Sequence, residues 1–208
     1  MAPKPTVARM AKAKNAYHHG DLRAALIAAA RHVLETARPE EITLKSLAHR
    51  LGVSQPAPYR HFANRDALLA AVAADGFERF RDALVAARDE APENEVFLRS
   101  ALAYLEFARA NRGVYRLMFA SHLLHEAGDE ALDRASSAAF DLLLEGVAKT
   151  APPERVRAIA MWIWSTLHGL AMLEAEGLAG GPPGADVGSA EVVREMMATL
   201  KGRSGGPG

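Results

Sequence analysis

Residues 42–62 read ITLKSLAHRLGVSQPAPYRHF, and this stretch decides the fold of the N-terminal third. Its first half has the apolar spacing of one helix face, formed by Leu44, Leu47, Ala48 and Leu51. Thr43 is a suitable N-cap for this short helix, and Gly52 is a suitable residue to end it. A tight corner and a second element from Ser54 complete a helix, a turn and a helix, which is the pattern of many DNA-binding domains.

The two prolines of this stretch constrain the second element. We expect Ser54 to cap a helix, with Pro56 in the first turn, where backbone N–H groups have no intrahelical partner. Pro58 gives up the first intrahelical hydrogen bond. The element is therefore expected to be short, with a rigid N-terminal end.

A recognition helix inserts its N-terminal residues into the major groove. Gln55 can pair with adenine, while the prolines offer apolar surface to thymine methyl groups. Tyr59 can reach a phosphate or a methyl group, Arg60 and His61 can meet the DNA backbone, and Phe62 is expected to point inward. The alternative is an ordinary proline-rich turn around a buried aromatic residue, and these residues alone leave it open.

Charge is distributed unevenly along the 208 residues, although the net charge is zero. Residues 1–65 hold 11 Lys/Arg and 4 Asp/Glu, whereas residues 66–208 hold 14 and 21. This asymmetry favours contact between the N-terminal third and a polyanion, although chance clustering on the surface would give the same count.

Composition excludes several classes of protein. The chain contains no cysteine, so disulfides and thiol chemistry are absent and any metal site would need histidines and carboxylates. The N-terminus has basic residues without the apolar run of a signal peptide. The uncharged stretch 158–173 is too short and too polar for a membrane span. We therefore expect a cytoplasmic protein that is not inserted in a membrane.

The rest of the chain is expected to be helical, giving an all-α protein of about nine helices. The first helix begins near Asp21, and another, capped by Asn64, runs to about Arg88. Further helices are expected at about 93–110, 112–124, 128–149, 153–176 and 189–201. We divide the chain into a basic arm (1–16), a helix-turn-helix domain (17–65), a helical effector-binding and dimerisation domain (66–202) and a disordered tail (203–208).

The segment ITLKSLAHRLGVSQPAPYRHFANRDALLAAVA resembles the DNA-binding segment of the tetracycline-repressor (TetR/AcrR) family, and YHHGDLRAALIAAA resembles the lead-in and first helix. The resemblance covers residues 17–75. It implies a transcription regulator that is not an enzyme and needs no cofactor. Family roles and the basic arm together give the expected DNA-binding residues: Lys12, Lys14, Thr43, Lys45, Ser54, Gln55, Pro56, Ala57, Tyr59, Arg60, His61 and Arg65. Ala57 and Pro58 depart from the residues common in the family, so no operator sequence can be borrowed.

The C-terminal part carries a weaker resemblance. WSTLHGL at 164–170 is similar to the Trp–His–Gly signature of one TetR C-terminal subgroup, and RGVYRLMF at 112–119 is similar to its short middle helix. Bulky residues with few polar groups suit an apolar or aromatic effector. Residues of these types at helical spacing are more often plain core. The candidates are Phe97, Leu98, Tyr104, Phe107, Tyr115, Met118, Phe119, His122, Trp164, His168 and Met172.

Helices 153–176 and 128–149 are expected to form a four-helix homodimer interface, because each has apolar residues on more than one face. On the first, Met161, Trp164, His168 and Met172 share one face, and Val156, Ile159, Ile163, Thr166, Leu170 and Leu173 share another. On the second the candidates are Leu132, Ala135, Ala139, Leu142, Leu143 and Gly146. A dimer also suits helix-turn-helix proteins, which read two half-sites of a palindrome.

The leading interpretation is a homodimeric repressor that a small effector releases from a palindromic operator. One alternative is a helical enzyme or metal-binding protein that uses His122, His125 and Glu126. Another is a helical adaptor whose basic arm binds an acidic protein. Neither the effector nor the operator can be read from the sequence.

Overall fold

The computed structural model describes residues 22–120, 129–178 and 187–204. These residues form eight α-helices joined by turns and short 3-10 helices, and they contain no β-strand. The expected all-α fold is confirmed for this part of the chain. The basic arm lies outside the described residues.

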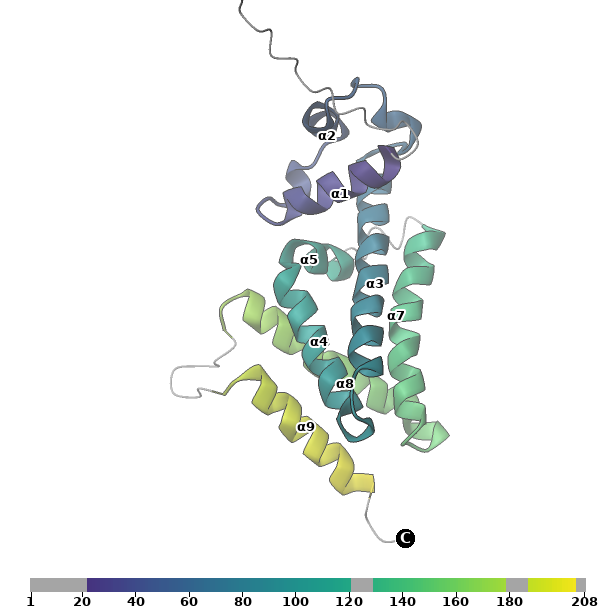
Figure 1. Ribbon diagram of the computed structural model, residues 1–208, viewed down its shortest axis with the longest axis vertical. Helices are drawn as coiled ribbons and strands as arrows, with labels where there is room; N and C mark the ends of the chain where they lie inside the picture. Colours follow the sequence, from purple (N-terminus) through teal and green to yellow (C-terminus); the bar gives the residue numbers. More distant parts are fainter. Residues whose placement is uncertain (1–21, 121–128, 179–186, 205–208) are drawn as a thin grey trace, which may run out of the picture.

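A small head at one end of the molecule contains α1 (Leu22–Leu34), α2 (Leu44–Leu51) and the 3-10 helices η1 (Pro39–Glu41) and η2 (Pro58–Arg60) (Figure 1). Helix α2 begins and ends as expected. Thr43 Oγ1 accepts a hydrogen bond from the Ser46 backbone N–H at 3.0 Å, and Gly52 adopts a left-handed φ of 67°. The core of the head buries Leu26, Ala30, Ile42, Leu47, Phe62 and Leu68.

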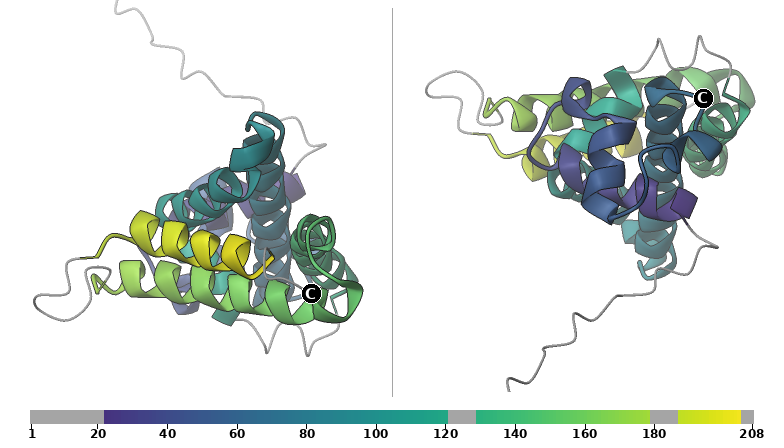
Figure 2. Two further views of the ribbon diagram at one scale, coloured as in Figure 1. Left: turned by 90° about the horizontal axis from the view of Figure 1, so that it is seen from below. Right: turned by 90° about the horizontal axis from the view of Figure 1, so that it is seen from above.

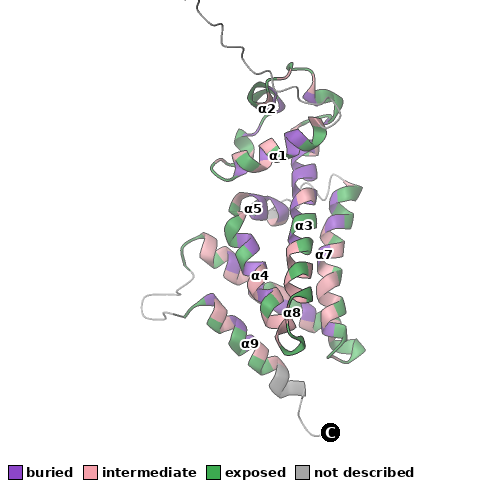
Figure 3. Cartoon of the chain, viewed as in Figure 1, coloured by how far each residue is buried: buried purple, intermediate pink, exposed green. Residues whose placement is uncertain are grey.

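Helix α3 (Arg65–Asp89) joins the head to the rest of the molecule. Its predicted N-cap is confirmed, because Asn64 Oδ1 accepts a hydrogen bond from the Ala67 N–H at 2.9 Å. Buried residues crowd its first sixteen positions, and the last turns toward Asp89 are half-buried or exposed (Figure 3). A single continuous helix therefore belongs to both parts of the protein.

The C-terminal bundle contains η3 (Glu93–Glu95), α4 (Val96–Ala110), α5 (Arg112–Ala120), α7 (Glu130–Ala148), η4 (Pro153–Arg155), α8 (Val156–Ala175) and α9 (Ser189–Ser204). Helix α7 runs along α3, α4 packs between α3 and α8, and α9 lies against α4 and α8. Viewed from below, α8 and α9 lie side by side across the base of the bundle (Figure 2).

Two expected boundaries change. Helix α9 continues to Ser204, two residues into the segment expected to be a tail, and residues 205–208 are not described. The helix expected over 112–124 is seen as α5 up to Ala120, and the remainder lies outside the described residues.

The apolar character of α8 exceeds the sequence-based expectation. The stretch Pro153–Ala175 is long and apolar enough to cross a membrane by length and composition, and only 22% of its most apolar window is buried in the chain. A single such helix is weak evidence for a membrane span, because the core helix of a soluble protein or a signal sequence passes the same test. Much of the apolar surface of α8 is therefore left uncovered by the described residues.

Candidate functional site

The second element of the helix-turn-helix is a turn followed by the 3-10 helix η2, not an α-helix capped by Ser54. Its bonds mostly span three residues: Ala57 N–H donates to Ser54 O at 3.0 Å, and His61 N–H donates to Pro58 O at 3.0 Å. The expectation of a Ser54-capped helix is therefore wrong. Pro58 has no N–H group for the first α-helical hydrogen bond, which would run to Ser54 O. The Ser54 carbonyl instead accepts from Ala57 N–H in a tighter turn.

The exposed side of this element presents most of the predicted DNA-reading side chains. Tyr59 is 56% exposed. Ser54, Gln55, Pro56, Arg60 and His61 are exposed, and Ala57 is half-buried. Pro58 and Phe62 are buried and fix the element to the core, as expected for Phe62. This surface is a rigid edge with polar groups and one large aromatic ring.

The residues expected to contact phosphates differ in whether their side chains are exposed or already bonded within the protein. Lys45 and Thr43 are exposed on α2. Arg65 is tied within the head, because its Nη2 donates to the Pro39 carbonyl at 2.8 Å and its Nε is buried without a partner. Lys12 and Lys14 lie outside the described residues. A phosphate contact by Arg65 remains a prediction.

Sequence reasoning missed Arg23, which lies beside the reading element. Its guanidinium carbon stands 5.4 Å from the centroid of the Phe62 ring, and the side chain is exposed on α1. No sequence signal links these positions, which only the fold brings together.

A cavity of about 840 Å³ opens within the C-terminal bundle. Five of the predicted ligand-binding residues line it: Phe97, Tyr104, Met118, Phe119 and Trp164. Leu98, Phe107, Tyr115, His168 and Met172 are not in its wall, and His122 lies outside the described residues. Phe107 instead packs edge-on against Phe80, with 5.2 Å between ring centroids.

Several lining residues were not predicted, among them Phe77, Phe80, Phe140, Met196 and Met197. They come from α3, α7 and α9, and the sequence analysis assigned these helices to packing or gave them no ligand-binding role. Apolar spacing marks such residues as inward-facing, and it cannot tell a packed core from the wall of a cavity.

A chain of hydrogen bonds lies behind the cavity wall. Tyr104 Oη lies 2.8 Å from Tyr115 Oη, which lies 2.8 Å from His168 Nδ1. Burial raises the pKa of Tyr104 to about 12, although hydrogen bonds with Tyr115 and Trp164 act in the opposite direction. Burial also raises the pKa of Tyr115 and lowers the pKa of His168. The three side chains are therefore neutral near pH 7 and satisfy one another, which makes Tyr115 and His168 supports of the wall.

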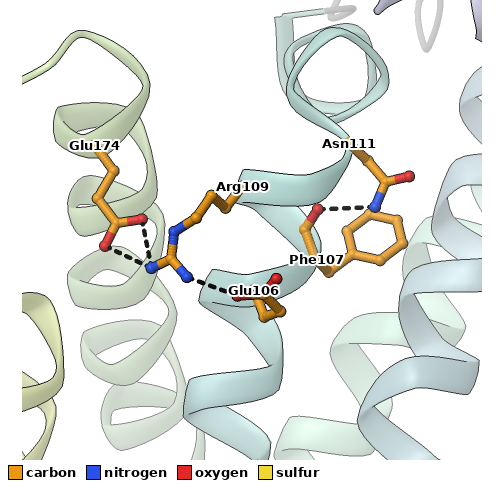
Figure 4. Close-up of polar contacts among 5 residues, drawn as sticks. All are labelled: Glu106, Phe107, Arg109, Asn111 and Glu174. Carbon is orange, nitrogen blue, oxygen red and sulfur yellow. Dashed lines mark hydrogen bonds and ion pairs between the residues drawn. The ribbon is translucent and has the colours of Figure 1, made fainter.

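The corner between α4 and α5 is clamped to the end of α8 (Figure 4). Arg109 Nη2 donates to both carboxylate oxygens of Glu174, at 3.2 and 3.1 Å, and its Nη1 donates to Glu106. The Asn111 side chain donates to the Phe107 carbonyl at 2.9 Å and closes the last turn of α4. The cavity wall on α4 and α8 is thus held from outside by polar contacts.

Helix α5 touches both the cavity and the head. Met118 lines the cavity, and its sulfur would lie 2.8 Å from a Cβ placed on Gly76 of α3. A Cβ placed on Gly113 would overlap the carbonyl oxygen of Leu34 at the end of α1. Arg31 and Asp75 add an ion pair of 2.8 Å between α1 and α3. The junction is therefore close-packed, and it depends on glycines where the helices meet.

The residues suggested for a metal-binding enzyme, His122, His125 and Glu126, lie outside the described residues. Across the described ranges, no group of three or more His, Cys, Asp or Glu side chains could hold a metal ion.

Two family models match the chain over the two regions just described. Residues 26–72 match the model of bacterial regulatory proteins of the tetR family, and residues 97–200 match the tetracyclin repressor-like C-terminal domain. The chain belongs to the TetR family. It is a DNA-binding transcription regulator of the helix-turn-helix type, in a family of regulators and not of enzymes. The Trp–His–Gly subgroup stays a prediction.

Solved structures agree with this assignment. A protein with unknown function from Rhodococcus sp. RHA1 is 34% identical over 91% of this chain and 98% of its own, with a TM-score of 0.77. A tetR-family transcriptional regulator from Streptomyces coelicolor is 22% identical, covers 88% of this chain and 81% of its own, and has a TM-score of 0.64. A TetR variant from Acinetobacter baumannii AYE in complex with minocycline is 23% identical, covers 87% and 97%, and has a TM-score of 0.57. No curated protein matches in the corresponding sequence search.

Proposed function

We propose that this TetR-family protein is a cytoplasmic, homodimeric repressor that leaves a palindromic operator when a small, largely apolar effector enters the bundle. The observation that carries the proposal is the cavity of about 840 Å³, which shares helix α3 with the DNA-reading head. The structural relative bound to minocycline has the same fold and holds a small molecule.

Coupling between the sites runs through α3 and α5. An effector shifts the DNA-binding equilibrium only if it binds the two conformations with different affinity. Phe77 and Phe80 of α3 and Met118 of α5 line the cavity. Gly113 of α5 lies against Leu34 of the head. A ligand that displaces Met118 therefore changes the tilt of the head relative to the bundle.

The outward face of α8 supports the dimer. Its exposed apolar side chains include Trp162 at 39% and Leu173 at 46%, with Gly169 between them. No atom lies within 4 Å of a Cβ placed on Gly169, so packing within one chain does not need a glycine there. Glycine inside a helix costs about 1 kcal/mol relative to alanine. A second copy of α8 that crosses at Gly169 explains both the glycine and the exposed rings.

The proposed interface differs from the one expected from sequence. On α7, Leu132, Ala135 and Ala139 are buried within the chain, and Leu142, Leu143 and Gly146 line the cavity, so these six form no outward face. On α8, Ile163 is buried, and the free stripe runs instead through Trp162, Ser165, Gly169 and Leu173. Packing against α4 and α7 sets the rotation of α8, which hydrophobic spacing alone left undetermined.

The dimer is tested by sedimentation of Leu173→Asp, with Leu178→Asp as its matched control. Both leucines are exposed, but Leu178 lies beyond the end of α8. We expect Leu173→Asp to shift the protein toward monomer and Leu178→Asp to behave as the unaltered chain. Equal behaviour of the two variants would contradict the α8 interface.

DNA reading is tested by selecting bound duplexes from a random library at one fixed salt concentration, because salt changes all such affinities. Recovery of a palindrome supports the proposal, whereas salt-sensitive binding without sequence preference contradicts it. On the selected site, Tyr59→Ala should weaken binding by about 1–3 kcal/mol, the value of a good base contact. Thr36→Ala, which alters an exposed residue near the α5 junction, serves as the control and should bind normally.

A further inference from the structure

The cavity is long and differs from end to end. Along α3 its wall extends from Phe77 to Arg88, and along α7 from Ser136 to Lys149. At the helical rise of 1.5 Å per residue, these spans correspond to roughly 16–20 Å. The two helices run side by side (Figure 1). The hollow therefore follows the helix axes and suits an elongated occupant.

All formal charge in the described wall lies at one end. Arg88 is in the last turn of α3, Glu93 is in η3, Glu145 is in the last turn of α7, and Lys149 follows that helix. In Figure 1 the lower ends of α3 and α7 mark this mouth. One end of an occupant would thus meet polar groups and water, and the rest would meet apolar side chains.

The charges at the mouth are balanced. Two cations and two anions lie in this part of the wall. Glu145 and Lys149 stand four residues apart in the sequence, and the Arg88 Nε also donates to Asp89 at 2.9 Å. An ionised head group would lose hydration on entry and find no net opposite charge. An uncharged hydrogen-bonding group avoids that cost.

The inner end carries no charged group, and its polar groups are few. They include Ser137 and Ser136, whose hydroxyl donates to the Asp133 carbonyl at 3.1 Å. Most of its surface comes from the aromatic side chains of Phe77, Phe119, Tyr104 and Trp164. The Tyr104 hydroxyl already pairs with Tyr115 at 2.8 Å. A charged group placed there would be desolvated without an opposite charge to compensate it.

We propose that the effector is an elongated amphiphile with a single polar head group, an inference that rests on the proposed sensor function. Its apolar chain lies along α3 and α7, and its one uncharged polar group lies at the mouth between Arg88 and Lys149.

The test measures calorimetric binding of octanol, decanol and dodecanol to the purified full-length protein. Each added methylene should tighten binding about threefold to fourfold, corresponding to about 0.8 kcal/mol per buried CH₂. Decanoate and decylamine at neutral pH should bind at least tenfold more weakly than decanol. Equal or tighter binding of either ion, or affinity that does not rise with chain length, would overturn the proposal.

Matched variants locate the site. Leu142 and Leu144 are both half-buried on α7, but only Leu142 lines the cavity. Leu142→Trp should abolish decanol binding by filling the hollow, whereas Leu144→Trp should leave it within about twofold. In Trp162→Phe, Trp164 is the one remaining tryptophan and its fluorescence should respond to decanol. Similar loss in both leucine variants, or an unresponsive Trp164, would place the alcohol elsewhere and refute the assignment.

Operator binding is measured separately. If the alcohols bind with the expected pattern but do not release DNA, the ligand class stands and the proposed release mechanism fails. If other molecules release DNA while the alcohols do not bind, the regulator function stands and the ligand class is wrong.

Discussion

The head and the bundle treat their aromatic residues in opposite ways. In the head, Phe62 is 3% exposed inside a closed core, and the large exposed ring, Tyr59, points away from it. In the bundle, rings such as Phe97, Phe140 and Trp164 surround a cavity of about 840 Å³. The head has a close-packed core, whereas the bundle encloses a cavity.

This difference matches two physical tasks. Close-packed interiors hold one arrangement and transmit displacement, which a DNA-reading surface needs. A hollow interior gives up packing contacts and gains room for a ligand. The four predictions below test this contrast, in order of decreasing effect.

The contrast predicts unequal costs for removing a ring. Phe62→Ala should lower the unfolding free energy by about 3–5 kcal/mol, the usual cost for a buried phenylalanine. Phe140→Ala should cost only about 1 kcal/mol, because its half-buried ring already faces the cavity. Urea denaturation measures both values, and equal losses would mean that the bundle is packed as tightly as the head.

The junction between α5 and the head should tolerate no added methyl group at Gly113. Gly113→Ala places a Cβ onto the Leu34 carbonyl, a rigid backbone atom, so we expect a loss of about 1–3 kcal/mol or more. Gly146→Ala is the control, because its Cβ would lie at an ordinary 3.8 Å from Phe97 and replacing a helical glycine favours the helix. Thermal unfolding of both variants decides whether this junction is rigid. A Gly113→Ala variant as stable as the unaltered chain would show that the helices can shift to admit the methyl group.

The N-cap of α3, the helix shared by the head and the bundle, should make a small local contribution to stability. Asn64→Ala removes the side chain that accepts the Ala67 N–H, and the expected loss is about 1 kcal/mol. Asn94→Ala, at an exposed position in η3, should change stability by less than about 0.5 kcal/mol. Chemical denaturation separates the two, and a neutral Asn64→Ala would show that α3 begins independently of its cap.

The bundle should also show a small pH dependence. Burial lowers the pKa of His168 in the folded chain, so its contribution to stability is complete above the ordinary pKa of about 6.5 and declines as pH falls toward the folded value. His168→Gln should flatten this part of the profile in unfolding titrations between about pH 5 and 8. His49→Gln, exposed on α2, is the control. An unchanged slope in His168→Gln would exclude this histidine as the source.

Local chemistry made much of the head predictable. Thr43 and Gly52 bound α2, and Asn64 caps α3, because capping depends on neighbouring backbone groups. The same reasoning failed at Ser54, where Pro58 removes the donor of the first α-helical hydrogen bond and a 3-10 helix forms instead. The exposure of Tyr59 and the burial of Phe62 still followed from their spacing.

The bundle was predictable only in outline. Its helices and their apolar residues were expected, and five of the proposed ligand-binding residues line the cavity. Phe77, Phe140 and Met196 were missed, because they come from helices distant in sequence. Apolar spacing shows that such residues face inward, but not whether they line a cavity or a packed core. The exposed Trp162 and the half-buried Gly169 of the α8 surface were not anticipated for a similar reason, since the rotation of α8 depends on its contacts with α4 and α7.

By itself, the sequence determined most of the helices, the caps at Thr43, Gly52 and Asn64, and the resemblance to the TetR family. Tertiary structure alone decided that the aromatic side chains of the bundle enclose a space, that Gly113 meets Leu34, and that Trp162 and Leu173 remain uncovered. The physical reason is the distance along the chain over which each interaction acts. Capping and hydrogen bonding act between close neighbours in the chain, whereas cavities, seams and free faces depend on how whole helices pack.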